Sequence, residues 1–181
     1  GWSNRQVWNN TALIAAGRWL GVPALVRQGM EGAHGILPQL EQAVSDEGRW
    51  HEGENYHFFA LRGFLLAAEV LREAGFDLYA DGELAGRLGA MYEAPLATVL
   101  PDLTLPARGN APYGVSIQQS RFAELWEIGW ARTRSRRIES VLCQLYAQDA
   151  PEAADPGFAE IAEQEHNRRA ERLRRAQLGW K

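Results

Sequence analysis

Residues 56–74 read YHFFALRGFLLAAEVLREA, and they carry the clearest structural signal in the chain. Apolar side chains dominate the stretch and recur with helical spacing, which predicts an α-helix that is buried on most sides. Gly75 follows directly and is the expected C-terminal cap. No segment shows the sustained alternation of a half-buried strand, so the sequence predicts an all-α fold.

The residues before this helix also have apolar side chains at helical spacing. We expect a first helix that starts after Ser3 as its N-cap and ends before Gly21. A second helical stretch covers residues 24–44, where two glycines and Pro38 are expected to bend or split it. Helices joined in pairs by turns indicate stacked antiparallel α-hairpins.

Another helix is expected at residues 82–99, with a kink at Pro95. Residues 102–114 are rich in proline and glycine and are expected to form a loop. The last third of the chain predicts helices at residues 116–132, 136–147 and 158–178. No strict repeat period is present, and we treat residues 1–181 as a single helical domain.

Composition excludes several classes of function. The chain has 181 residues, 46% of them hydrophobic, and a net charge of −4, so no basic excess points to nucleic acid. No apolar run approaches the roughly 18 residues of a membrane span. Cys143 is the only cysteine and lies among apolar helical residues, so we expect a buried, inert thiol.

Residues 50–57, WHEGENYH, combine two carboxylates, two imidazoles, a phenol, an amide and an indole. Few structural needs call for that mixture, and we interpret the segment as the rim of an active site. His51 and His57 are six residues apart, which is not the spacing of a helical zinc site. Glu52 and Glu54 do not form a convincing glycosidase pair, so a hydrolase is unsupported.

Tyr56 is the strongest catalytic candidate. His57 and Arg62 are neighbours that can favour its phenolate, and a phenolate can abstract a proton near neutral pH. The alternative is a ring that packs in the core with its hydroxyl hydrogen-bonded, and the residues alone leave both interpretations open.

Asn9 and Asn10 follow Trp8 in the first helix, where asparagine is a poor helix former. One amide can face a cleft and donate hydrogen bonds to a substrate carboxylate, whereas an exposed helix face is the simpler explanation. Seven tryptophans occur in the chain. Most are expected in helix interfaces, but Trp8 and Trp50 lie in polar motifs and are candidate platforms for sugar rings.

Three motifs occur in order: NxQxWxN from Asn4, GxWxEG from Gly48 leading into YHF at Tyr56, and PDxTLPA from Pro101. Together they resemble the heparinase II/III-like polysaccharide lyases over residues 4–114. The resemblance implies an incomplete α/α toroid followed by an antiparallel β domain. It also implies cleavage of uronic-acid polysaccharides by β-elimination.

The resemblance implies roles for individual residues. Asn10 and Asn9 match the region that neutralises the uronate carboxylate, and Tyr56 matches the tyrosine that serves as base or acid. Many relatives have histidine at the position of Asn9. Candidate substrate-binding residues are Trp8, Trp50, His57, Arg62 and Asn110.

The β domain of the family, with its further catalytic histidine, is not in these residues. We therefore expect the chain to be the toroid part of a longer lyase and a poor catalyst by itself. No cofactor or metal is expected in it, and its expected partners are an acidic polysaccharide and the missing β domain. The resemblance favours a periplasmic or secreted protein.

Two alternatives remain open. The first is a non-catalytic helical carbohydrate-binding or scaffold module that binds sugar through Trp8 and Trp50. The second is an interaction protein whose final charged helix binds a partner.

Overall fold

The computed structural model describes residues 2–80, 82–109 and 113–147. The chain divides into two compact units, Gly1–Ser116 and Ile117–Lys181, where the sequence analysis expects one domain. We call them the N-terminal and C-terminal units and describe each by itself. The described part is mostly helical and contains no strand beyond two isolated bridges, so the expected all-α class is confirmed. The helices of the N-terminal unit are α1 (Asn4–Leu20), α2 (Pro23–Glu31), α3 (Ile36–Gln42), α4 (Glu54–Glu73), α5 (Gly82–Glu93) and the 3₁₀ helix η1 (Ala94–Ala97).

α1 begins and ends as its sequence predicts. The Ser3 side chain accepts a hydrogen bond from the Gln6 amide, and the helix ends at Gly21. α2 runs back along α1, and the two helices pack closely at Gly29, where a Cβ would lie 2.7 Å from the Asn10 carbonyl oxygen. The stretch expected at 24–44 is split into α2 and α3 by four residues. Pro38 lies in the first turn of α3. Backbone N–H groups in a first turn have no acceptor within the helix, so a proline there breaks no hydrogen bond.

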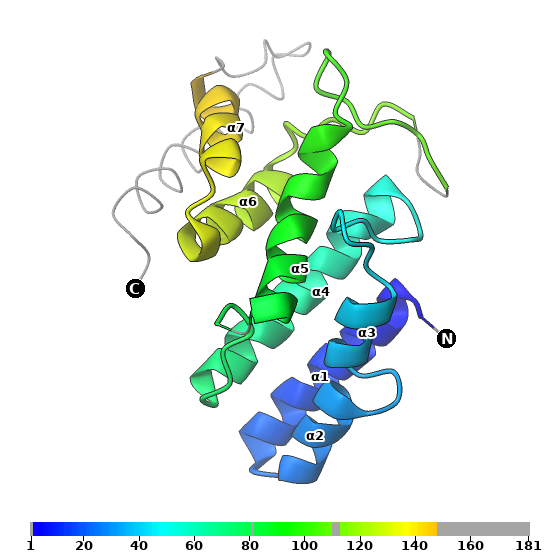
Figure 1. Cartoon of the computed structure of the whole chain (residues 1–181), viewed down its shortest axis with the longest axis vertical. Helices are drawn as coiled ribbons and strands as arrows, with labels where there is room; N and C mark the ends of the chain where they lie inside the picture. Colours follow the sequence, from blue (N-terminus) through cyan, green and yellow to red (C-terminus); the bar gives the residue numbers. More distant parts are fainter. Residues whose placement is uncertain (1, 81, 110–112, 148–181) are drawn as a thin grey trace, which may run out of the picture. The chain divides into compact units, whose positions relative to one another are not determined.

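α4 is the central helix of the N-terminal unit. Buried side chains cover most of its circumference, as expected, among them Phe58, Leu61, Phe64, Leu65 and Leu71. α1 lies beside α4 and runs in the same direction (Figure 1). Their contact is close because Gly63 has no side chain, and a Cβ there would lie 2.8 Å from Val7 Cγ1.

α5 runs antiparallel to α4, so that its end returns to the start of α4 (Figure 1). It is shorter than expected: the helix ends at Glu93, and residues 94–97 tighten into η1 with Pro95 in its first turn. The proline lacks an N–H and so favours a new helical start over a kinked continuation. The pairing of α1 with α2 and of α4 with α5 gives the α-hairpins that the sequence predicts.

The C-terminal unit contributes α6 (Ser120–Thr133) and α7 (Arg136–Ala147) to the described residues. Ile138, Leu142 and Leu145 are buried and form one face of α7. Cys143 is exposed, so the expected burial is wrong. The residue follows Leu142 directly, which turns it about 100° away from the apolar face. The helix expected at 158–178 lies outside the described residues. Of the helices that are described, none has the length and apolar character needed to cross a bilayer.

Candidate functional site: a cleft beside the start of α4

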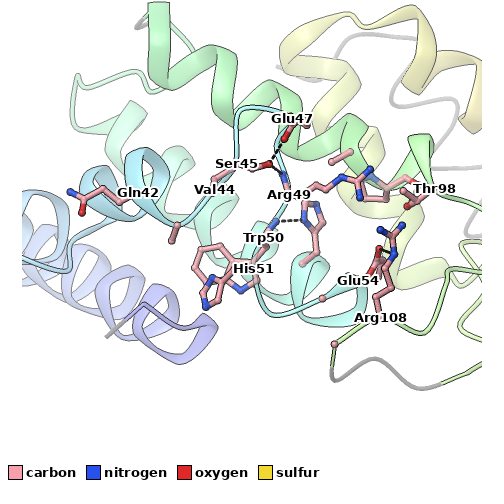
Figure 2. A pocket seen from close by; sticks show the side chains of 16 residues that line it. Gln42, Val44, Ser45, Glu47, Arg49, Trp50, His51, Glu54, Thr98 and Arg108 are labelled. Atoms are coloured by element: carbon pink, nitrogen blue, oxygen red, sulfur yellow. Dashed lines mark hydrogen bonds and ion pairs between the residues drawn. The ribbon is translucent and has the colours of Figure 1, made fainter.

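A cleft of about 580 Å³ opens in the N-terminal unit, between residues 42–54 and residues 94–109 (Figure 2). The first of these segments contains the second sequence motif, and the second follows α5. Charged and polar side chains from both segments line it, including Arg49, His51, Glu54, Thr98 and Arg108. The cleft therefore combines a mostly apolar lining with a few charged and polar groups that can orient a ligand.

An ion pair joins the two walls. Arg108 Nε lies 3.1 Å from Glu54 Oε1, with the Glu54 side chain only 13% exposed. The backbones also meet, because a Cβ at Gly53 would lie 2.5 Å from the Arg108 carbonyl oxygen, and Gly53 has a φ of +105°. Glycine is needed at this position for its conformation and for its lack of a side chain. The loop that carries Arg108 is thus fixed against the start of α4.

Arg49 follows a tight turn that begins at Ser45. The Ser45 hydroxyl donates a hydrogen bond to Glu47 (2.9 Å) and accepts one from the Arg49 amide (3.2 Å). The hydrogen bond from Ser45 is the main cause that lowers the pKa of Glu47, and the charge of Arg49 adds to it. Gly48 presses this turn against α5, since a Cβ there would lie 2.2 Å from the Ala90 carbonyl carbon.

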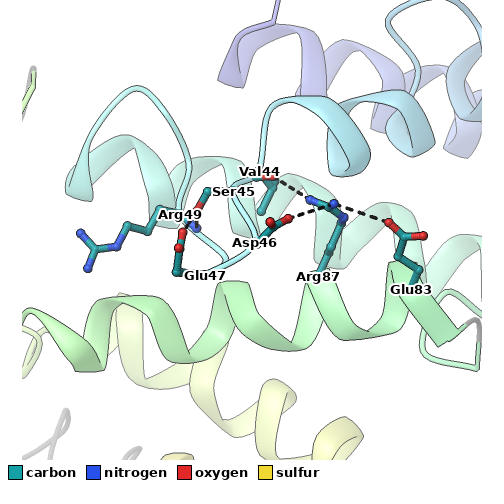
Figure 3. Close-up of polar contacts among 7 residues, drawn as sticks. All are labelled: Val44, Ser45, Asp46, Glu47, Arg49, Glu83 and Arg87. Atoms are coloured by element: carbon teal, nitrogen blue, oxygen red, sulfur yellow. Dashed lines mark hydrogen bonds and ion pairs between the residues drawn. The ribbon is translucent and has the colours of Figure 1, made fainter.

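A second arginine fixes the same turn from outside. Arg87 of α5 pairs with Asp46 (3.1 Å) and Glu83 (3.5 Å) and donates a hydrogen bond to the Val44 carbonyl (3.0 Å). Figure 3 shows that the Arg49 guanidinium points away from this group of charges. Arg87 has a structural role, because its charge is already matched by carboxylates.

His57 is buried beneath the cleft, with 4% of its surface exposed. Its Nδ1 accepts a hydrogen bond from the Trp50 amide (3.2 Å), so its Nε2 carries the proton and donates to the Met91 carbonyl (2.8 Å). Burial is the main cause that lowers the pKa of His57 to about 4. The imidazole is therefore neutral near pH 7, and both nitrogens hold α4 against its neighbours.

Glu52 is the acceptor for three donors. Its Oε2 lies 2.7 Å from the Asn4 amide, 3.0 Å from Asn4 Nδ2 and 2.8 Å from the Trp50 indole nitrogen. The Trp50 indole is 3% exposed and packs against Phe64. Trp50 lines the cleft as part of its wall, while its ring faces are covered by protein.

Two other predicted residues belong to the packing of α1. Asn10 is 2% exposed; its Oδ1 accepts from Gln6 Nε2 (3.0 Å), and its Nδ2 donates to the His34 carbonyl. Trp8 donates from its indole nitrogen to the Phe59 carbonyl (3.1 Å) and packs against that ring. Neither residue lines the cleft, and the neighbouring Asn9 is exposed on α1.

Tyr56 lies in the first turn of α4 and is partly buried. It lies between Glu54 and His57, which line the cleft, although its own side chain is not part of the lining. Arg62 is partly buried further along the same helix. Asn110 lies outside the described residues. The sequence thus predicts the segment of the cleft but not its cations, Arg49, which lies inside the second motif, and Arg108, which directly follows the third.

Within the described residues, no group of three or more histidine, cysteine, aspartate and glutamate side chains is placed to bind a metal ion. Comparison with protein-family models, with curated proteins and with solved structures finds no match to this chain.

Proposed function

We propose that this chain is the helical part, an incomplete α/α toroid, of a lyase that cleaves uronic-acid polysaccharides by β-elimination. The cleft beside α4 is the place where the acidic glycan binds. One observation carries the proposal: two arginines, Arg49 and Arg108, line a cleft of about 580 Å³ whose walls adjoin the motifs that resemble the lyases. Guanidinium groups suit carboxylates in both charge and geometry.

The reaction makes clear demands on the protein. The C5–H bond of the uronate breaks, its electrons form the C4–C5 double bond, and the C4–O bond to the leaving sugar breaks. A base takes the C5 proton, and an acid gives a proton to the leaving oxygen. Negative charge spreads onto the uronate carboxylate during the step, so hydrogen-bond donors or cations must stabilise it.

Tyr56 is the proposed base and acid, on the strength of the family resemblance and of its place in the first turn of α4, from which Glu54 and His57 reach the cleft lining. The proposed neutralising amides face different conditions. Asn9 is exposed, whereas the Asn10 amide reaches a substrate only if its hydrogen bonds to Gln6 and His34 open. His57 keeps its neutral structural role.

The test is a pair of tyrosine variants of the intact enzyme, assayed for the ultraviolet absorbance of an unsaturated uronate on incubation with alginate and with glycosaminoglycans. Tyr56→Phe should abolish product formation and keep the helical circular dichroism of the parent. Tyr113→Phe, at a side chain that is 93% exposed, is the matched control and should react like the parent. Product formation by Tyr56→Phe at the parent rate would remove Tyr56 from the mechanism.

A non-catalytic carbohydrate-binding module is the second candidate. It is favoured by the cleft lining, which contains cations but neither Tyr56 nor Asn10. Saturable binding of a polyuronate with no unsaturated product, in the parent chain, would favour this candidate over the lyase.

A further inference from the structure

Three arginines belong to the cleft or to the turn at residues 44–49 beside it, and two of them form ion pairs with carboxylates. Arg87 pairs with two carboxylates, and Arg108 pairs with Glu54. The guanidinium of Arg49 makes no hydrogen bond or ion pair with any residue in the described part of the chain, and Figure 2 shows it reaching across the cleft toward Thr98. Arg49 therefore brings a guanidinium into the cleft whose N–H groups are not used by a described residue, while its charge acts on Glu47 without forming an ion pair.

The position of Arg49 does not depend on its charge. Its backbone is held by the Ser45 hydroxyl and by the Ser45 amide, which donates to the Arg49 carbonyl (3.0 Å). The nearest carboxylate in sequence, Glu47, accepts a hydrogen bond from Ser45, and Figure 3 shows the guanidinium pointing away from it. The turn thus directs the Arg49 guanidinium into the cleft, while the neighbouring Glu47 carboxylate is hydrogen-bonded to the Ser45 hydroxyl.

We propose that Arg49 determines specificity by binding the carboxylate of a uronic acid unit in this cleft. The inference rests on the proposed function, since it names the group that recognises the acidic glycan. A guanidinium donates two parallel hydrogen bonds to a carboxylate, a geometry that a neutral sugar hydroxymethyl group does not satisfy. Arg49 binds substrate and takes no part in the proton transfer assigned to Tyr56.

The opposite wall supports the same ligand. Arg108 is held in place by Glu54, so its remaining N–H groups are oriented without being consumed. The Thr98 hydroxyl donates to the Pro95 carbonyl (3.2 Å), which leaves its oxygen able to accept from a sugar hydroxyl. Arg49 supplies the charge, and these groups supply polar contacts around it.

The experiment is calorimetric titration of the 181-residue chain with an unsulfated oligomannuronate. Further arms use the same oligosaccharide with its carboxyl groups reduced to alcohols, and a sulfated oligosaccharide without uronate. The variants are Arg49→Gln, Arg49→Lys and the control Arg72→Gln. Arg72 lies in the last turn of α4, at the end opposite Glu54, and its loss changes the net charge by the same amount.

We expect Arg49→Gln to weaken oligomannuronate binding by about tenfold or more, because a charged hydrogen-bond partner is lost. Arg49→Lys should give an intermediate affinity, and Arg72→Gln should match the parent. The carboxyl-reduced sugar should not bind. Circular dichroism and a thermal melt of each variant measure whether the fold is retained. We expect it to be retained, because the turn is held by backbone hydrogen bonds of residue 49 that do not involve its side chain.

Three outcomes would overturn these ideas, and they differ. If Arg49→Gln binds the oligomannuronate with the same affinity as the parent, Arg49 is not the carboxylate ligand, and the proposed function still stands. Arg49-dependent binding of the sulfated sugar but not of the oligomannuronate would replace the carboxylate by a sulfate. A parent chain that binds neither the oligomannuronate nor the sulfated oligosaccharide would contradict the proposed function itself.

Discussion

Glu52 accepts a hydrogen bond from the backbone amide of Asn4 at 2.7 Å, across 48 residues of sequence. This carboxylate is placed at the N-terminus of α1, where free amide groups and the helix dipole both favour a negative charge. A residue of the most polar motif thus helps to cap a helix far from it in the chain.

The first prediction concerns the capping carboxylate. Glu52→Ala should lower the free energy of unfolding by about 2–3 kcal/mol, because it leaves the donors of Asn4 and Trp50 without their acceptor. Urea denaturation measures the change. Glu41→Ala, at an exposed position of α3, is the control and should stay within about 0.5 kcal/mol of the parent. Equal stabilities of the two variants would contradict a capping role.

The neighbours Asn10 and Asn9 allow a buried asparagine to be compared with an exposed one. Asn10→Ala should destabilise the fold by about 1–3 kcal/mol, since it removes the partner of Gln6 and of the His34 carbonyl in a buried site. Asn9→Ala should leave the thermal midpoint nearly unchanged. If Asn9→Ala also abolishes lyase activity in an active form of the enzyme, Asn9 is the neutralising amide.

Acid should destabilise the protein through His57. Its folded pKa of about 4 is below the ordinary value of 6.5, so the unfolded chain binds the proton more tightly. The contribution of His57 to the free energy of unfolding is fully present above pH 6.5. It falls by up to about 3 kcal/mol as the pH drops toward 4. Urea midpoints at several pH values measure the slope.

The matched variants for that measurement are His57→Gln and His51→Gln. The first should be less stable at pH 7 and should flatten the acid slope, because a glutamine amide does not titrate. The second replaces an exposed imidazole and should keep the parent slope. A slope that survives in His57→Gln would mean that other groups cause the acid effect.

Two glycines test the backbone contact beneath the cleft. Gly53→Ala should lower stability by about 2 kcal/mol or more, because a Cβ meets the Arg108 carbonyl at 2.5 Å and the positive φ is strained. Gly86→Ala, in α5 with open space around it, should raise stability by about 0.5–1 kcal/mol. Thermal melts of both variants give the comparison, and a neutral Gly53→Ala would mean that the loop carrying Arg108 moves freely.

The helices of the described chain are predictable because their signals are local. The Ser3 cap, the apolar periodicity of α4 and the loop between α5 and α6 are all encoded by neighbours in sequence. Cys143 shows the limit of such reasoning. An apolar neighbourhood in sequence does not fix a residue on the apolar face, because one step along a helix turns the side chain by about 100°.

The cleft is less predictable because its parts are distant in sequence. Arg49 and Arg108 line one cavity only because the chain returns along α5 and its following loop touches Gly53. The orientation of the Trp50 indole depends on Glu52, and the engagement of Asn10 depends on the loop before α3. Motifs located the region, whereas tertiary contacts determined which side chains reach it.

The contact between Glu52 and Asn4 also has a kinetic consequence. It closes a loop of 48 residues. Closing such a long loop costs chain entropy before the contact forms, so the contact is expected to form late in folding. The α1–α2 hairpin can form from neighbouring residues, but the first turn of α1 lacks its carboxylate until the segment before α4 arrives. The amide of Asn4 should therefore be among the last in its helix to gain protection from hydrogen exchange during refolding.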